Sequence, residues 1–493
     1  MSALPSFPAF PTSALAPPPL ADEQASANDA VTHQAIYRAL FDDFGDADTA
    51  AMSRDWLQAR LAEAENLPCA LPDSPNGLLA WMHEGSARAS AQYQRYVAER
   101  KAGASRRFFS NRSHALAFLR SVAPTKLVDG SWLHGVLRHW SNPRHAELVR
   151  TYIEELGDGR PDRNHVLLYR QLLARHGIET SPSDLPDDRY TQPAIQLALA
   201  RHTDDLLPEV IGFNLGYEQL PLHLPITAYE LNELGIDPYY FTLHVTVDNQ
   251  DTGHAHRAVA AVLDTIPRFG DAADFWRRVR NGFRLNDLGA GTNDVIRQFD
   301  QQQEVERIFK RKSEAGRTAH ADYCKVAGRS VNDWLSTPAQ VPDFLKALET
   351  AGWIVRNAAP EQSRFWKLLD GDHAEMFGVF SAYELQAIQD WLRGDFSLDG
   401  AAVPDTTTGI GIQRPRSFRA QQRLAAARLP EGGLAAGAEA SLDPDVEALE
   451  ARIAQAPDIA ALGALLVDAM APSRHWMPAG LLATRRFVQL TGA

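Results

Sequence analysis

Apolar residues recur at helical spacing along most of this 493-residue chain. Ala, Leu, Arg and Gln, which favour helices, dominate these segments, while Gly and Pro lie mainly at their ends. The stretch 239–247 has local β propensity, but helical neighbours override so weak a preference, and we predict a helix there too. The pattern therefore indicates an all-α fold, with helices predicted over 33–43, 51–64, 88–100, 113–121, 145–156, 164–175, 192–200, 204–220, 226–234, 239–250, 254–265, 273–282, 294–312, 341–351, 381–393, 446–455 and 458–471.

Changes in composition divide the chain into five parts. Residues 1–30 are rich in proline and favour extended, unpacked backbone, so we expect a disordered arm. A helical domain follows over 31–285, and a helical C-terminal extension over 286–400. Residues 401–445 lack apolar periodicity, as a linker or surface segment does, and a last helical pair within 446–493 is expected to close the chain.

Charge and cysteine content exclude several classes of protein. The formal net charge is −13 and no Lys/Arg-rich run offsets it, which argues against binding to nucleic acid. The two cysteines, Cys69 and Cys324, form neither a disulfide framework nor a CxxC pair. No apolar run approaches the roughly 20 residues of a membrane span, and no signal peptide is evident. We therefore expect a cytoplasmic protein without a membrane partner.

Short catalytic motifs are missing from the sequence: it has no HExxH, no Walker loop and no GxSxG. The densest group of metal-ligating residue types instead comprises His244, Asp248, Asp251, His254 and His256. In a regular helix, Asp248 and Asp251 lie within about 40° and 20° of His244, so the three share one face. Burying that face without partners would be costly, and a divalent metal supplies the partner. A solvated helix end is the alternative.

Two further stretches offer carboxylates and a histidine. Glu155 and His165 are separated by a segment that contains Gly157, Gly159 and Pro161. Both side chains can therefore face one site only if the backbone bends or a short loop joins two helices. The alternative for this pair is an exposed helix end, because glutamate is seldom buried.

Glu218 ends a largely apolar segment, where a charged side chain needs a reason. We predict that it is the bridging carboxylate of a metal site. Glu209 competes for that role, but it lies two and a half turns away and so faces the opposite side of the helix. A structural pair between Glu218 and an arginine is the alternative.

In this order, Glu155-x9-His165, Glu218 and His244-x3-Asp248 with a following histidine resemble the heme-oxygenase-like diiron oxidases and oxygenases, also described as iron-containing redox enzymes. The resemblance covers roughly 90–270, and the phrases at 123–133 and 376–380 are also similar to the family. It implies a heme-oxygenase-like helical bundle with an additional C-terminal helical region. The metal ligands that it implies are Glu155, His165, Glu218, His244, Asp248 and His254.

The last ligand departs from the family pattern. Family members commonly carry the final histidine seven residues after the first, but here Asp251 has that position and a histidine appears only at 254. A regular helix would place His254 about 80° from His244, so the helix must break or bulge at Gly253 for His254 to reach the metal. Asp251 as the ligand is the alternative.

The resemblance implies an iron-dependent oxidoreductase that binds two iron ions and activates O2 to oxidise a small molecule of amino-acid-like or fatty-acid-like type. The expected partners are the substrate, O2 and an external reductant, and a homodimer is left open. Two other readings also stay open. One keeps the fold with heme or with a cofactor-free oxidase site. The other is a non-catalytic helical binding or scaffold protein, in which the metal-like residues are coincidental.

Overall fold

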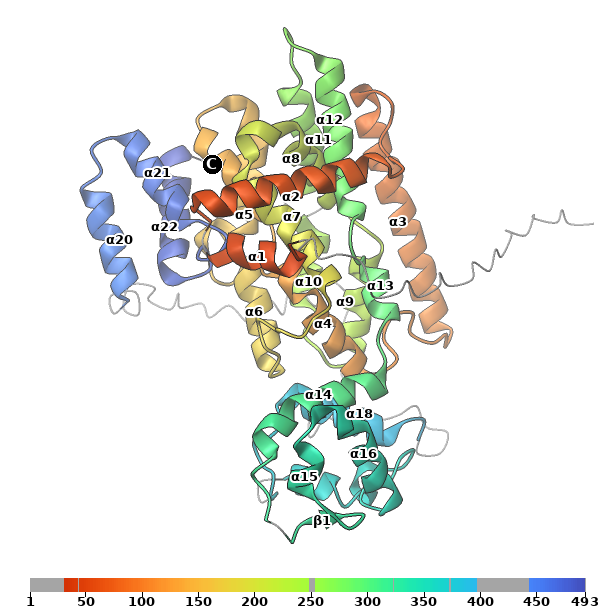
Figure 1. Cartoon of the computed structure of the whole chain (residues 1–493). Helices are drawn as coiled ribbons and strands as arrows, with labels where there is room; N and C mark the ends of the chain where they lie inside the picture. The colour runs from red at the N-terminus through yellow and green to blue at the C-terminus, as the bar shows by residue number, and fades with distance from the viewer. Residues whose placement is uncertain are drawn as a thin grey trace, which may run out of the picture.

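The protein is a helical body with a smaller helical lobe beneath it (Figure 1). This computed structural model describes residues 31–42, 44–247, 253–321, 323–371, 374–396 and 443–492. The expected arm at 1–30 and nearly all of the expected linker at 401–445 lie outside the described residues. Among the described helices, none is both long enough and apolar enough to cross a bilayer.

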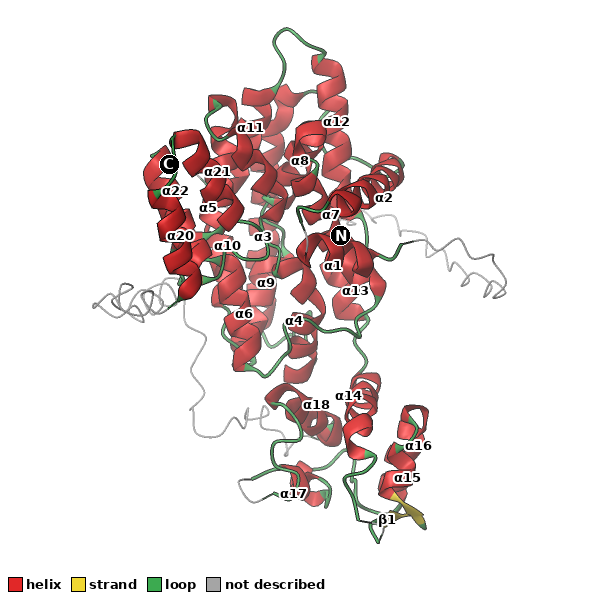
Figure 2. Ribbon diagram, turned by 60° about the vertical axis from the view of Figure 1, so that its left-hand side comes forward, coloured by secondary structure: helices red, strands yellow, loops and turns green. Residues whose placement is uncertain are grey.

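The body is built from helices that bury one or more faces in two large hydrophobic clusters. Its central helix α11 contacts both α5 and α8, and residues in or next to these three helices form part of the candidate site (Figure 2). The body comprises α1 (His33–Asp42), α2 (Ala47–Glu65), α3 (Leu78–Lys101), α4 (Arg112–Lys126), α5 (Ala146–Glu155), α6 (His165–Arg175), α7 (Thr191–Arg201), α8 (Thr203–Tyr217), α9 (His223–Glu233), α10 (Tyr239–Val247), α11 (His254–Thr265), α12 (Ala272–Arg284) and α13 (Thr292–Arg297). Short 3-10 turns connect them: η1 (Pro75–Gly77), η2 (Ser131–His139), η3 (Pro143–His145), η4 (Gly157–Gly159), η5 (Asp187–Tyr190) and η6 (Leu285–Asp287).

The lobe has a hydrophobic cluster of its own, formed by residues between Val305 and Leu392. It meets the body where the backbone N–H of Ser113 donates to Asp390 at 2.8 Å and α18 packs on α4. The lobe comprises α14 (Gln301–Gly316), β1 (Lys325–Val326), β2 (Arg329–Ser330), α15 (Val331–Leu335), η7 (Pro338–Gln340), α16 (Val341–Thr350), η8 (Pro360–Gln362), α17 (Trp366–Leu369) and α18 (Ala382–Arg393). The two strands form an antiparallel hairpin.

The C-terminal segment, residues 443–492, returns to the body and packs beside α5 (Figure 1). It comprises α20 (Pro444–Ala454), α21 (Ile459–Ala469) and α22 (Pro478–Thr491). Leu466, Met470 and Phe487 of this segment are buried in the larger cluster of the body.

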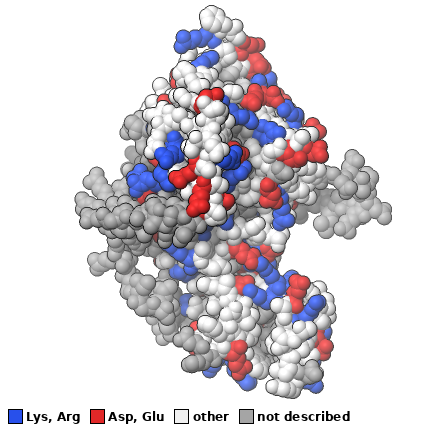
Figure 3. Space-filling view, turned by 90° about the vertical axis from the view of Figure 1, so that its left-hand side faces the viewer, with Lys and Arg blue, Asp and Glu red and all other residues white. Residues whose placement is uncertain are grey.

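On the face drawn in Figure 3, the visible acidic and basic side chains are interspersed rather than sorted into large patches of one sign.

The structure confirms the all-α prediction and the helix at 239–247, and it corrects the prediction in several places, including α3, which begins ten residues before the helix predicted over 88–100. The single helix expected over 294–312 is two helices, because the Asp300 side chain accepts from the Gln303 N–H at 2.8 Å and starts α14. The chain does not close on a helical pair, because α22 follows. The hairpin in the lobe was also unexpected, and its strands are only two residues long.

A buried histidine makes the docking of the C-terminal segment sensitive to acid. His134 donates through Nε2 to the carbonyl of Val467 at 3.0 Å. Burial lowers the pKa of His134 from 6.5 to about 4; Arg138 and Arg474 also lower it, whereas Asp468 raises it. The folded chain therefore keeps this histidine neutral at a pH where the unfolded chain protonates it.

The sign follows from proton linkage: the stability that neutral His134 contributes is complete above pH 6.5 and is lost as the pH falls toward 4. Between pH 7 and pH 5, wild type should lose about 2 kcal/mol more unfolding free energy than His134→Gln because of this one group. Urea unfolding followed by circular dichroism at both pH values measures the difference. Equal losses in the two proteins would show that folded His134 titrates normally.

Candidate metal centre

Two groups of buried acidic and histidine side chains lie at the centre of the body. Within each group, one ligand atom per residue lies within 4.8 Å of every other. The four-residue group is Asp129, Glu155, His165 and His244, and the three-residue group is Glu155, Glu218 and His254. Glu155 belongs to both, so the two groups are adjacent and share one carboxylate.

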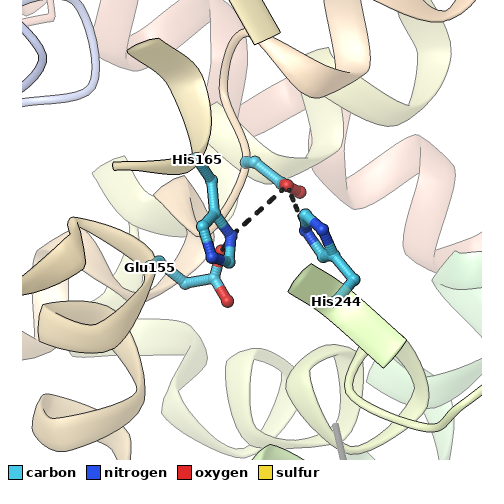
Figure 4. A group of neighbouring side chains, drawn as sticks. Glu155, His165 and His244 are labelled. Carbon is cyan, nitrogen blue, oxygen red and sulfur yellow. Dashed lines mark hydrogen bonds and ion pairs between the residues drawn. The ribbon is translucent and has the colours of Figure 1, made fainter. Parts of the chain in front are cut away.

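The four-residue group is built from close acid–histidine pairs. Figure 4 shows the side chains of Glu155, His165 and His244 converging. His165 Nδ1 lies 2.6 Å from Glu155 Oε2, and 4.0 Å from Asp129 Oδ2. His244 Nε2 lies 3.0 Å from the same Asp129 oxygen. Two imidazole nitrogens and two carboxylates therefore face one point.

The three-residue group uses the other oxygen of Glu155. His254 Nδ1 lies 3.2 Å from Glu155 Oε1 and 3.1 Å from Glu218 Oε2. Because Oε2 of Glu155 faces His165 and Oε1 faces His254, the two ends of this carboxylate face different groups. This is the arrangement of a carboxylate that bridges two cations.

Most of these side chains come from helix ends rather than helix centres. Glu155 is the last residue of α5, and His165 and His254 are the first residues of α6 and α11. Glu218 is the C-terminal cap of α8, whereas His244 lies within α10. The ends of several helices thus lie close together. The periodicity of residues along any single helix cannot reveal this.

A glycine allows Asp129 and Glu155 to approach each other. Gly130 has a φ of 77°, and a Cβ placed on it would lie 2.8 Å from Cβ and Cγ of Glu155. A larger residue would combine a left-handed backbone with a direct clash. Gly130 therefore lets the turn that carries Asp129 lie directly against Glu155.

Asp129 is held by hydrogen bonds from two tyrosines. The hydroxyl of Tyr217 donates to Oδ1 at 3.0 Å, and that of Tyr240 donates to Oδ2 at 2.6 Å. Burial raises the pKa of Asp129, but the charge of Lys126, 3.9 Å away, and the hydrogen bond to His244 outweigh it and lower the pKa to about 2. Asp129 is therefore an ionised carboxylate, the form that binds metals.

His244 is oriented as a metal ligand would be. Its Nδ1–H donates to the Tyr240 carbonyl at 2.8 Å, and its Nε2–H donates to Asp129 at 3.0 Å, so loss of the Nε2 proton would leave a lone pair facing Asp129. Burial lowers the pKa of His244, but the hydrogen bond and charge of Asp129 raise it to about 9. A metal ion would therefore take the place of a proton between these two side chains.

Glu155 is also ionised, although it is only 4 % exposed. Burial raises the pKa of its carboxyl, but the charges and hydrogen bonds of His165 and His254 hold that pKa well below its usual range. In the absence of cations, the neighbouring imidazoles are the groups that stabilise this buried carboxylate. Divalent cations would serve the same purpose while using the imidazole lone pairs.

His254 is oriented by a carboxylate outside the two groups. Its Nε2–H donates to Glu154 at 2.9 Å, which leaves Nδ1 to face Glu155 and Glu218. Arg150 and Arg257 in turn hold Glu154, at 2.8 and 3.3 Å. Such a carboxylate–histidine pair fixes the ring and strengthens the imidazole as a ligand.

We expect Glu154→Gln to weaken metal binding at the three-residue group by about 10-fold, because the neutral amide orients His254 less firmly. Titration of the metal-free protein with Fe(II) under anaerobic conditions measures the affinity. Glu147→Gln is the matched control, since Glu147 contacts Arg257 at 3.2 Å but has no contact with His254 among the described interactions. Equal affinity in wild type and Glu154→Gln would contradict the orienting role.

The structure brings Glu155, His165, Glu218, His244 and His254 together in two adjacent groups, and their binding of metal stays a prediction. Asp248 lies outside the described residues. The exposed-helix-end alternative for the pair Glu155 and His165 is wrong, because both are buried and a short loop joins their helices.

The alternative ligand Asp251 also lies outside the described residues. Gly253 is extended and immediately precedes α11, so His254 does not continue a regular helix through Gly253.

Two expectations need correction. The sequence favoured Glu218 as the bridging carboxylate, but Glu155 is the residue whose oxygens face both groups, because α5 ends between them. Asp129 was missed as a site residue, although its surrounding phrase at 123–133 was noted as family-like. Glu209 is excluded as expected, since Arg278 holds it at 2.6 Å, away from both groups.

A cavity of about 480 Å³ lies elsewhere, along the C-terminal half of α3. Arg95, Arg100, Arg106 and Arg107 contribute to its lining, and no member of the two acid–histidine groups does. This cavity is therefore separate from the two acid–histidine groups.

A family model described as iron-containing redox enzyme matches residues 116–287, which include all members of both groups. The match supports a heme-oxygenase-like fold for this region of the chain. The comparisons with curated proteins and with solved structures gave no match. The lobe and the C-terminal segment lie outside the matched residues.

Proposed function

We propose that this protein is a nonheme diiron enzyme that uses O2 to oxidise a small-molecule substrate. The observation that carries the proposal is Glu155, whose two carboxylate oxygens face two separate groups of donors. The match of residues 116–287 to the iron-containing redox enzymes supports iron as the metal. An external reductant is part of the proposal, since the catalytic iron must be returned to Fe(II) after it reacts with O2.

The donors suit iron. Imidazole and carboxylate ligands accommodate both Fe(II) and Fe(III), whereas structural zinc sites commonly use cysteine thiolates. Cys69 and Cys324 belong to neither group. Three buried carboxylates without cations would need protonated histidines beside them, and two divalent ions remove that requirement.

In this proposal, Asp129, His165 and His244 hold one ion, Glu218 and His254 hold the other, and Glu155 is shared. Bound iron would supply the electrons that reduce O2.

The chain's own residues keep the donors in place around these ions. Tyr217 and Tyr240 orient Asp129 through their hydroxyls, and Glu154 orients His254. Burial of all the donors keeps bulk water away from the reacting centre.

Anaerobic iron loading followed by metal analysis tests the proposal. We expect two iron ions per chain, and O2 uptake on mixing the Fe(II) protein with aerated buffer and a reductant. A chain that binds zinc but no iron would overturn it, as would iron binding without O2 uptake. An intense Soret band in the purified protein would indicate heme instead. His244→Ala should abolish the O2 uptake, and His202→Gln is the control, because His202 is buried but bonds to Ser53, outside both groups.

A further inference from the structure

The C-terminal segment contacts the loop that separates Glu155 from His165. Arg485 of α22 donates to the carbonyl of Gly159 in this loop at 2.7 Å. A Cβ on Gly159 would lie 2.4 Å from the carbonyl oxygen of Leu481, so the backbones are in direct contact. This segment lies beyond the family match, and the proposed function gives it no role.

One side chain of the C-terminal segment, that of His475, is buried and contacts the end of this loop. His475 lies between α21 and α22, is 1 % exposed, and places Nδ1 3.1 Å from Nδ2 of Asn164. The Asn164 amide donates, so His475 accepts as a neutral ring. Burial lowers the pKa of His475 to about 3, in agreement with that neutral form.

Asn164 joins the two ends of the loop. Its Nδ2 also donates to the carbonyl of Leu156 at 3.3 Å, directly after Glu155. Its Oδ1 accepts from the Leu167 N–H at 3.0 Å and so caps α6, whose first residue is His165. The same amide therefore contacts the backbone next to one candidate ligand and sets the start of the helix that carries the other.

His475 helps to fix which way the Asn164 amide points. Asn164 could in principle present its oxygen or its nitrogen to either side. Because His475 Nδ1 and the Leu156 carbonyl both accept, the NH2 group must face them, and the oxygen is left to cap α6. Without the acceptor on His475, one amide hydrogen would be buried without a partner, and the capping orientation would lose part of its advantage.

We propose that His475 is a positioning residue of the metal centre: through Asn164 it sets the geometry of the Glu155–His165 pair, so that the C-terminal segment completes the four-residue group. The inference rests on the proposed function, since it concerns metal binding at that group. It gives the segment outside the family match a role at the site beyond packing.

Three variants of the full chain test this role. His475→Leu removes the acceptor but keeps an apolar side chain in the buried position. His475→Asn restores an acceptor, because its amide oxygen is as many bonds from the backbone as Nδ1 is. Phe487→Leu weakens the packing of the same segment in the hydrophobic cluster without touching the loop.

The measurement is Co(II) titration of the metal-free proteins, with affinity and d–d absorption recorded for each ion bound. We expect His475→Leu to weaken binding at the four-residue group by about 10- to 100-fold and to change its spectrum. His475→Asn should restore most of the affinity. Phe487→Leu should lower the melting temperature yet bind both ions as wild type does.

The proposal fails if His475→Leu binds both ions with wild-type affinity and spectrum. It also fails if Phe487→Leu weakens metal binding as much as His475→Leu, because the effect would then come from loss of packing. These results are distinguishable from failure of the proposed function, in which wild type itself would bind no metal ion at these groups.

Discussion

Replacing Glu155 by alanine is expected to abolish iron binding at both groups and, with it, O2 uptake. Each oxygen of this carboxylate faces a different histidine, 2.6 Å from His165 and 3.2 Å from His254. Both ions would therefore lose a charged ligand at once. We expect affinity for iron to fall by more than about 100-fold, beyond the effect of removing an outer hydrogen-bond partner. Metal analysis after anaerobic loading measures the stoichiometry.

Glu209→Gln is the matched control for this experiment. Glu209 is also a buried glutamate, but it pairs with Arg278 and belongs to neither group. The control should keep two iron ions per chain even if its melting temperature falls. If Glu155→Ala retained even one tightly bound ion, the shared carboxylate would not be essential to both groups, and the bridging role would be wrong.

Changing Asp129 to asparagine should remove one ion and leave the other. Asp129 belongs only to the four-residue group, so Glu218 and His254 would keep their contacts with Glu155. The amide preserves the shape and one acceptor oxygen, but it lacks the charge that balances a cation. We expect about 100-fold weaker binding at this group, a loss of the size found when metal centres lose supporting interactions. The iron content should fall from two per chain to one.

Tyr217→Phe is the companion variant for Asp129. It removes a single hydrogen bond to Oδ1 and leaves the carboxylate and the Tyr240 contact in place. Its effect on affinity should not exceed about 10-fold. Two ions bound tightly to Asp129→Asn would show that Asp129 only orients His244 rather than binding metal.

Much of the candidate site could be predicted, because a polar side chain in an apolar segment can be recognised from the sequence alone. His244 and Glu218 lie in apolar segments, where a polar side chain needs a partner. An interruption at Gly253 was expected if His254 is a ligand, from the angle that a regular helix would give it, and Gly253 is extended in the structure. Asp129 gave no such signal, since an aspartate followed by Gly130 is usual in a turn and no other ligand type lies at helical spacing from it.

The helices, too, could be predicted from the sequence only in part. Periodic segments such as α6 and α11 were predicted to within a residue or two, because apolar spacing and caps act locally. The helix α22 was missed, although Pro478 near its start and the left-handed Gly492 at its end are usual helix boundaries. The boundary between α13 and α14 was also missed, because it depends on one capping residue, Asp300.

The sequence by itself determined the helices, their breaks and the supply of histidines and carboxylates, because these follow from contacts a few residues apart. Only the tertiary structure decided that Glu155 rather than Glu218 belongs to both groups, that Asp129 belongs to the four-residue group, and that His475 reaches Asn164 across 311 residues of chain. Such pairings depend on how helix ends converge in a packed core, and no local periodicity encodes that convergence.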